Sequence, residues 1–327
     1  MPSRRRLIAA GGAIVAAGVV RRASAADPPF PTRPVRLLVG IPAGGAPDVI
    51  ARILAERLSA VWGQPVLVDN RPAASGNLAA QAVARSEADG HTLFFAHASV
   101  LLLNEALTRD VPFNTERDFA PISLLMTTPF MVACRPGLQA ATLADLREVA
   151  RGKPGGVTFA TLSATGLPRF VVERVKWALG TEMTNVPYAT MSGAVQDVIA
   201  GRVDLLADGT PVITPQVRAG ALKALAVTSP ARDPALPAVP AAAESIPGFS
   251  SKGWFGLLAP AATPQPVLRR IAEDSRRVLA DEALRARLLR DFGADTVAGT
   301  PAEFAASLAE DRRIYREVIR QVGILVD

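Results

Sequence analysis

The fold is decided by residues 35–63, which read VRLLVGIPAGGAPDVIARILAERLSAVWG. Residues 35–41 form a short, continuous apolar run, as expected for a strand that is buried on both faces of a sheet. The glycine-rich turn 42–46 follows, and residues 47–62 then place apolar side chains at helical spacing, with Gly63 as the stop. A strand, a tight turn and a helix in this order predict a parallel sheet covered by helices.

The same rhythm continues along the chain. We expect further strands at residues 66–68, 92–96, 130–134, 157–160, 203–207, 224–228 and 253–259. We expect further helices at residues 75–85, 168–179, 191–200, 264–292 and 301–322, and a surface connection at residues 229–247. A chain of 327 residues has room for about two domains. Two α/β domains place a ligand cleft between them, at the carboxyl ends of the strands.

Composition excludes several classes of function. Hydrophobic residues make up 49% of the chain and charged residues 20%, which indicates a globular protein rather than a disordered one. The single cysteine, Cys134, has no disulfide partner, and the only histidines are His91 and His97. We therefore expect no metal site, and no cofactor either, because both glycine fingerprints of nucleotide-binding loops are missing.

The net charge of +6 comes mostly from the first residues. Residues 1–25 hold five arginines and no acid, and the rest of the chain has 31 basic against 30 acidic residues. No basic stripe remains, so we expect no nucleic-acid partner. Residues 1–26 combine a basic start (RRR at 4–6), an apolar stretch at 7–20 and ASA at 23–25, which predicts an export signal. Both the Sec and the twin-arginine route stay open, and we expect a periplasmic protein that is soluble after signal cleavage.

The turn before the first helix is the most informative candidate for ligand binding. Gly44 and Gly45 let the backbone approach a ligand closely, and the helix N-terminus behind them favours an anion such as a carboxylate. A purely structural turn is the alternative. Asp48 also has a ligand-binding and a structural interpretation, because an acid in the first turn of a helix stabilises the helix dipole.

Polar side chains also follow other predicted strands. His97 and Ser99 contact a ligand or cap a helix over residues 101–107. Asp208 accepts from a ligand hydroxyl or ammonium, or caps its own turn. The remaining ligand-binding candidates are Ala43, Thr161, Ser163, Thr165 and Tyr188. No metal cluster and no activated nucleophile is evident in the sequence, which favours a binding protein over an enzyme.

Nine short segments also carry a resemblance to a known family. They are PVRLLVGIPAGG at 34–45 with Asp48, GQPVLVDNRP at 63–72 with Gly76 and Asn77, DGHTL at 89–93, DFAPIS at 118–123, VPY at 186–188, IAGRVD at 199–204, LKALAVTS at 222–229, WFGLLAP at 254–260 and TPAEF at 300–304. In this order and at these spacings, over residues 34–322, the chain resembles the Bug family. These proteins are the extracytoplasmic solute-binding receptors of tripartite tricarboxylate transporters.

The resemblance implies a two-domain Venus flytrap of the type II-like periplasmic-binding-protein fold. We place domain 1 at residues 27–127 plus 229–327 and domain 2 at residues 128–228. The implied ligand is a small organic carboxylate, held by backbone N–H groups of the turn 43–45 and by the segments 161–165 and 188–192. The implied partner is a membrane permease, and we expect a monomer without enzyme activity.

Two alternatives stay open at this point. The same fold serves as a ligand sensor that docks on a membrane histidine kinase. A secreted α/β esterase would use Ser99 or Ser163 with His97, although the chain lacks the G-x-S-x-G motif of that class.

Overall fold

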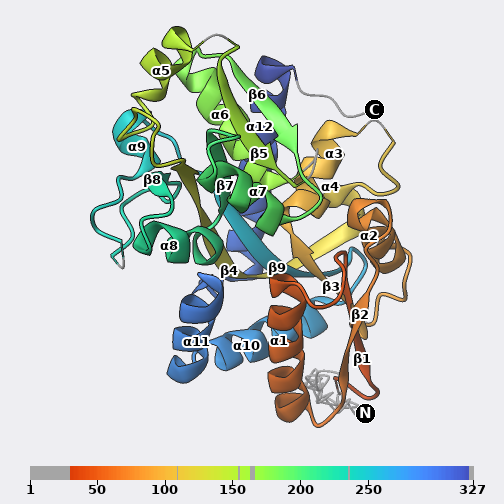
Figure 1. Cartoon of the computed structure of the whole chain (residues 1–327). Coiled ribbons are helices and arrows are strands. Elements are labelled where there is room, and N and C mark those ends of the chain that lie inside the picture. Colours follow the sequence, from red (N-terminus) through yellow and green to blue (C-terminus); the bar gives the residue numbers. More distant parts are fainter. Residues whose placement is uncertain (1–29, 109, 154, 163–165, 235, 324–327) are drawn as a thin grey trace, which may run out of the picture.

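The structure, a computed structural model, describes residues 30–108, 110–153, 155–162, 166–234 and 236–323. These residues form a single mixed sheet. Its strand order is β2 (Val66–Asn70), β1 (Val35–Val39), β3 (Thr92–His97), β9 (Lys252–Pro260), β4 (Phe119–Cys134), β7 (Leu205–Gly209), β5 (Val157–Thr161) and β6 (Met183–Pro187). Beside this path, β8 (Lys223–Val227) and β10 (Asp295–Thr296) pair with β4. Helices flank the sheet in both halves of the molecule (Figure 1), so the predicted α/β class is confirmed. The predicted export signal at residues 1–26 lies outside the described residues.

The first half of the sheet begins with the stretch 35–63. β1 (Val35–Val39) pairs in parallel with β2 (Val66–Asn70) and β3 (Thr92–His97). The α-helices that follow β1 and β2 are α1 (Ala46–Trp62) and α2 (Asn77–Ala84). The side chains of β1 alternate between two hydrophobic clusters, one shared with α1 and the other with α2. The prediction of a strand buried on both faces is therefore confirmed.

One long strand, β4 (Phe119–Cys134), belongs to both halves of the sheet. Its first part pairs with β9 (Lys252–Pro260) and its last five residues pair with β7 and β8. The sequence predicted only residues 130–134 of this strand. Pro121 and Pro129 lie in the missed part, where two register shifts also break the alternation that marks a strand.

In the second half of the sheet three strands, β5, β6 and β7, are parallel, whereas β8 pairs antiparallel with β4. The strands of this half are β5 (Val157–Thr161), β6 (Met183–Pro187), β7 (Leu205–Gly209) and β8 (Lys223–Val227). The three longer helices beside them are α6 (Leu167–Leu179), α7 (Met191–Ile199) and α8 (Thr210–Arg218). The strands predicted here are confirmed to within about two residues, whereas α8 was not predicted.

The predicted helix 264–292 is wrong as a single element. It consists of α10 (Gln265–Leu279) and α11 (Glu282–Phe292). The chain leaves helical geometry at Asp281, whose carboxylate accepts a hydrogen bond from the Leu284 N–H at 2.7 Å. An aspartate in this position starts a new helix, because it satisfies an N–H group that has no partner within the helix.

The last helix, α12 (Pro301–Val322), contacts both halves of the molecule. Toward β9, the Trp254 Nε1–H donates to Asp311 Oδ2 at 2.8 Å. Toward α6, the rings of Phe170 and Tyr315 pack edge to face with centroids 4.8 Å apart. One hydrophobic cluster runs through these contacts from the first half to the second, so α12 joins the two halves on one side.

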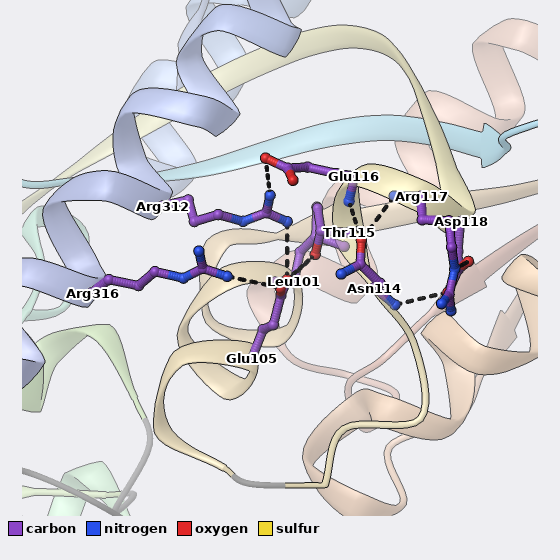
Figure 2. A network of polar contacts seen from close by, with 9 residues as sticks. All are labelled: Leu101, Glu105, Asn114, Thr115, Glu116, Arg117, Asp118, Arg312 and Arg316. Carbon is purple, nitrogen blue, oxygen red and sulfur yellow. Dashed lines mark hydrogen bonds and ion pairs between the residues drawn. The ribbon is translucent and has the colours of Figure 1, made fainter.

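A polar network ties α12 to the segment between β3 and β4 (Figure 2). Arg312 pairs with Glu105 at 3.1 Å and with Glu116, and Arg316 lies 3.4 Å from Glu105. The hydroxyl of Thr115 donates to Glu105 at 2.6 Å. The Glu105 side chain, of which 13% is exposed, thus accepts from two arginines and one hydroxyl.

Short elements complete the described chain. They are η1 (Ala74–Gly76), η2 (Ser99–Leu103), α3 (Asn104–Leu107), α4 (Thr115–Asp118), α5 (Leu146–Gly152), α9 (Ala242–Ser245) and β10 (Asp295–Thr296). None of the helices in the described residues has the length and apolar character needed to cross a membrane.

Candidate functional site

A cavity of about 560 Å³ lies where the two halves of the sheet meet. Its walls come from the ends of β3 and β7, from β4 and β9, and from helix termini of both halves. The lining residues are Ile41, Gly44, Ala46, Pro47, Val49, Ile50, His97, Ser99, Thr128, Phe130, Leu167, Pro168, Asp208, Gly209, Pro211, Val212, Gly253, Trp254, Phe255, Asp291 and Phe292. This volume is in the range of sites for small organic molecules.

Three helices begin at this cavity with the same three-residue pattern. The sequences G-A-P at 45–47, G-L-P at 166–168 and G-T-P at 209–211 start α1, α6 and α8, and each glycine is an N-cap without a side-chain acceptor. Residues from all three starts line the cavity. Because each helix N-terminus carries a partial positive charge, the three together favour an anion there. The repeated G-x-P pattern is visible in the sequence, although only the first of the three turns was predicted as an anion site.

The turn before α1 is supported from behind by Asp48. The N–H of Gly44, a residue with a left-handed φ of 88°, donates to Asp48 Oδ2 at 2.8 Å. Asp48 also accepts from Arg52 Nε at 3.1 Å and from Asn70 Nδ2 at 2.9 Å. Burial acts to raise the pKa of Asp48, but the hydrogen bonds from these three residues outweigh it and hold the pKa below its ordinary value. Asp48 therefore positions the turn as an ionised, fully bonded carboxylate.

The cavity collects only part of the predicted ligand-binding set. The predicted residues that line it are Gly44, His97, Ser99 and Asp208. The predicted residues outside its lining are Ala43, Gly45, Asp48, Thr161 and Tyr188. Ser163 and Thr165 lie outside the described residues.

Thr161 and Tyr188 make contacts within the second half of the molecule. The Thr161 hydroxyl donates to Asn185 Oδ1 at 2.7 Å on the neighbouring strand. The Tyr188 hydroxyl donates to Asp197 Oδ2 at 2.6 Å on α7. Both hydroxyls thus hydrogen-bond to groups of the protein itself.

His97 lies at the end of β3, against the ring of Phe255. Burial lowers the pKa of His97 to about 4, so the imidazole is neutral at pH 7. Its Nε2 atom is buried and has no hydrogen-bond partner among the described residues. Nε2 therefore does not activate Ser99, as the esterase alternative requires. The helix after β3 has Ala98 as its N-cap, so the prediction that His97 or Ser99 caps it is wrong.

Asp208 lies near the end of β7, just before the N-terminus of α8. Its Oδ1 accepts from the Gly209 N–H at 2.6 Å, while Oδ2 has no hydrogen-bond donor among the described residues. Burial raises the pKa of Asp208 to about 6, and the bond from Gly209 offsets only part of that rise. Asp208 therefore has, among the described residues, one carboxyl oxygen without a hydrogen-bond donor.

The cavity walls are mainly apolar and aromatic. Phe130, Trp254 and Phe255 line it from β4 and β9. From the sequence these residues are predicted as strand positions in the core, because a ring beside a cavity and a ring in the core have the same sequence signature. Their rings give a ligand's carbon atoms an apolar surface.

The charged groups of the lining are two aspartates. No arginine or lysine is among the described lining residues. Asp291 is paired with Arg290 at 2.9 Å and with Arg287 at 3.6 Å. Among the described residues, no group of three or more His, Cys, Asp or Glu side chains is arranged to hold a metal ion. The donors available to an anion at the described cavity are therefore backbone N–H groups, hydroxyls and one neutral imidazole.

Comparisons with known proteins place this geometry in context. The sequence model of the "tripartite tricarboxylate transporter family receptor" matches residues 50–324. Protein BugT of Bordetella pertussis is 31% identical over 324 residues, which are 97% of this chain and 98% of BugT. A structure of an R. palustris protein with adipate is 30% identical with a TM-score of 0.78, over 90% of this chain and 99% of that one. The periplasmic binding protein BugD is 29% identical with a TM-score of 0.75, over 90% of this chain and 99% of that one.

Proposed function

Because this chain belongs to the family of tripartite tricarboxylate transporter receptors, we propose that it captures a small organic carboxylate in the periplasm and delivers it to a membrane permease. The match to the family, together with the likeness to BugT and BugD, confirms the resemblance to Bug proteins and the two-domain binding-protein fold. These relatives are receptors, which supports a binding role over catalysis.

The observation that carries the proposal is the meeting of three glycine-capped helix N-termini at one cavity. α1 comes from the first half of the molecule, and α6 and α8 come from the second. A carboxylate between them gains from the dipoles of both halves at once. An anionic ligand thereby favours an arrangement in which the two halves stay close together, which is how ligand binding shifts such a receptor toward its closed form.

The apolar part of the cavity fits the hydrocarbon part of an organic ligand. Phe130, Trp254 and Phe255 give apolar surface beside the anion-binding helix starts. Adipate, the molecule in the similar R. palustris structure, combines carboxylates with an apolar middle. A ligand built in this way fits a cavity that has an anion-binding part and an apolar part.

Delivery requires that a permease distinguishes the liganded receptor from the empty one. We take the two domains to be residues 27–127 plus 229–327 and residues 128–228, moving about the crossing strands β4 and β9, with α12 packed along one side. The export signal at residues 1–26 sends the chain to the periplasm, and the receptor acts there as a monomer. Closure about the ligand then presents a surface made from both domains to the permease.

A thermal-shift screen of the mature receptor, residues 27–327, tests the proposal. The probes are adipate, malate, citrate, benzoate and single amino acids, at rising concentration. We expect at least one carboxylate to raise the melting temperature, since a ligand at about 100 times its Kd adds about 2.7 kcal/mol to the free energy of unfolding. A flat response to every carboxylate, with no acid released from the denatured protein in mass spectrometry, contradicts the proposal.

Two glycines on either side of α1 give a matched pair of variants for the site itself. Gly44 and Gly63 both have positive φ, at 88° and 64°, and a Cβ at either one meets nothing within 4 Å. Gly44→Ala and Gly63→Ala therefore carry a similar backbone strain of roughly 1 kcal/mol. Only Gly44 lines the cavity, so we expect Gly44→Ala to weaken carboxylate binding at least tenfold and Gly63→Ala to leave it unchanged. Equal affinities in the two variants would place the anion elsewhere.

A further inference from the structure

Asp208 is the one acid of the cavity lining for which the described residues provide no cation. Asp291 lines the same cavity and is paired with two arginines. Asp48, behind the neighbouring turn, is bonded to Arg52. For Asp208 the single bond within the described residues is the one from the Gly209 N–H. An ionised carboxylate in such a position is costly unless a positive group joins it.

We propose that Asp208 binds a positively charged nitrogen of the ligand, so that this receptor selects carboxylates that also carry an ammonium group. This inference rests on the proposed function, and it narrows the ligand from organic carboxylates in general to amino-carboxylates with an apolar body. The carboxylate of the ligand meets the helix N-termini, and its ammonium group meets Asp208.

The local geometry prepares Asp208 for this role. The Gly209 N–H holds Oδ1 at 2.6 Å and fixes the carboxyl group at the start of α8. Asp208 lines the cavity, and among the described residues the Gly209 N–H is the one donor to its carboxyl group, which leaves Oδ2 without a donor. A carboxylate that is held by one oxygen and open at the other can accept from an ammonium group without losing its anchor.

The aromatic lining is compatible with a cation. Phe130, Trp254 and Phe255 line the cavity together with Asp208, and the faces of aromatic rings attract positive charge. The described lining also contains no arginine or lysine, which favours a ligand with a positively charged group. A second carboxylate on the ligand would find no basic side chain there, whereas an ammonium group finds a carboxylate.

The opposite arrangement is a protonated Asp208 that donates to a ligand carboxylate. Burial raises the pKa of Asp208 to about 6, so its protonated form is accessible in mildly acidic solution. The two arrangements differ in what asparagine does at position 208. Asparagine imitates a protonated aspartate, because it keeps an acceptor and adds a neutral donor, but it cannot compensate an ammonium group.

Calorimetric titration with matched ligands decides between them. Adipate, hexanoate and 6-aminohexanoate share one chain length and differ in the charge at the far end. L-phenylalanine and 3-phenylpropanoate differ only in the α-ammonium group. We expect wild-type protein at pH 7.5 to bind the amine-bearing member of at least one set ten times more tightly than its partners. We expect Asp208→Asn to abolish that preference.

Asp110→Asn is the control, because it removes one negative charge from an exposed acid that lies outside the cavity lining. We expect this variant to keep the wild-type order of affinities. If wild type prefers adipate and 3-phenylpropanoate, and Asp208→Asn keeps this order, the inference is wrong while the carboxylate receptor stands. If wild type binds none of these acids and none of the carboxylates of the thermal-shift screen, both proposals are wrong. The wild-type preference needs no variant, so the test survives a misfolded Asp208→Asn protein.

Discussion

Two carboxyl groups of this molecule are largely withdrawn from solvent: Glu105 in the network of Figure 2 and Asp208 in the cavity. They differ in the hydrogen-bond donors that the fold supplies to them. Glu105 receives Arg312, Arg316 and the Thr115 hydroxyl. Among the described residues, Asp208 receives only the backbone N–H of Gly209. A buried charge that is fully paired holds segments of the fold together, whereas one that is left incomplete beside a cavity is available to a ligand.

The difference follows from where the partners come from. Arg312 and Arg316 lie on α12, about two hundred residues beyond Glu105, and only the packing of this helix brings them to the segment after β3. Asp208 sits where two strand ends and three helix starts meet, and the described parts of these elements bring no basic side chain to the lining. The same fold therefore satisfies one carboxylate and leaves the other to be satisfied from outside.

Removing Arg312 is the largest expected disturbance of this comparison. Its side chain is 8% exposed, and its loss leaves the partly buried Glu105 with Arg316 and the Thr115 hydroxyl as its donors among the described residues. We expect Arg312→Ala to lower the free energy of unfolding by about 3 kcal/mol in urea denaturation. Arg316→Ala is the control, because Arg316 is 61% exposed and its loss should cost no more than about 0.5 kcal/mol. Equal effects of the two variants would mean that Glu105 is not held as a buried charge.

Asp208→Asn should raise the free energy of unfolding, whereas Arg312→Ala should lower it. The folded state raises its pKa from 3.8 to about 6, so the fold favours the protonated form. This stabilisation is complete below pH 3.8 and is lost as the pH rises through about 6. Ligand-free Asp208→Asn should therefore match wild type near pH 4 and exceed its free energy of unfolding by about 2–3 kcal/mol at pH 8. Unfolding curves across this range measure it, and a variant less stable than wild type at pH 8 would reveal a cation bound to Asp208 in the fold.

Asp48 should show the reverse pH dependence on a smaller scale. Hydrogen bonds from Gly44, Arg52 and Asn70 lower its folded pKa below 3.8, so its contribution is present above the unfolded pKa and is lost as the pH falls through the folded value. Asp48→Asn should destabilise the protein at pH 7 by about 1–2 kcal/mol. The deficit should shrink in melting experiments below pH 4, and a constant deficit would assign it to packing instead of charge.

Tyr188 gives the smallest expected effect and separates contact with the ligand from contact within the protein. Its hydroxyl donates to the half-buried Asp197 and does not reach the described cavity lining. Tyr188→Phe should barely change the melting temperature and should leave the affinity for a carboxylate found in the screen unchanged. A tenfold loss of affinity in calorimetric titration would show that Tyr188 contacts the ligand.

Much of the fold was predictable because its signals are local. The buried strand before Gly40, the helix after Pro47 and the stop at Gly63 are each determined within a few residues. β4 was predicted only in part, because prolines and register shifts remove the alternation over its first half. The break at Asp281 was missed because one residue that caps a helix is a weak signal inside a long amphipathic run.

The candidate site was predictable only where it lies at strand ends. Gly44, His97, Ser99 and Asp208 follow predicted strands, and the structure brings them to one cavity. Phe130 and Trp254 were missed as lining residues, because apolar residues of a strand look the same whether they face a core or a cavity. Tyr188 follows a strand as well, yet its hydroxyl turns to α7.

The sequence by itself determined the α/β class, the strand–turn–helix units and the likeness to solute-binding receptors, since periodicity, turn residues and short motifs act over a few positions. Only the tertiary structure decided which carboxylates are paired and which one is left open. That choice depends on side chains from distant elements, as when α12 brings Arg312 to Glu105 while no described element brings a cation to Asp208. Charge pairing is a property of positions in space, and local sequence patterns do not encode it.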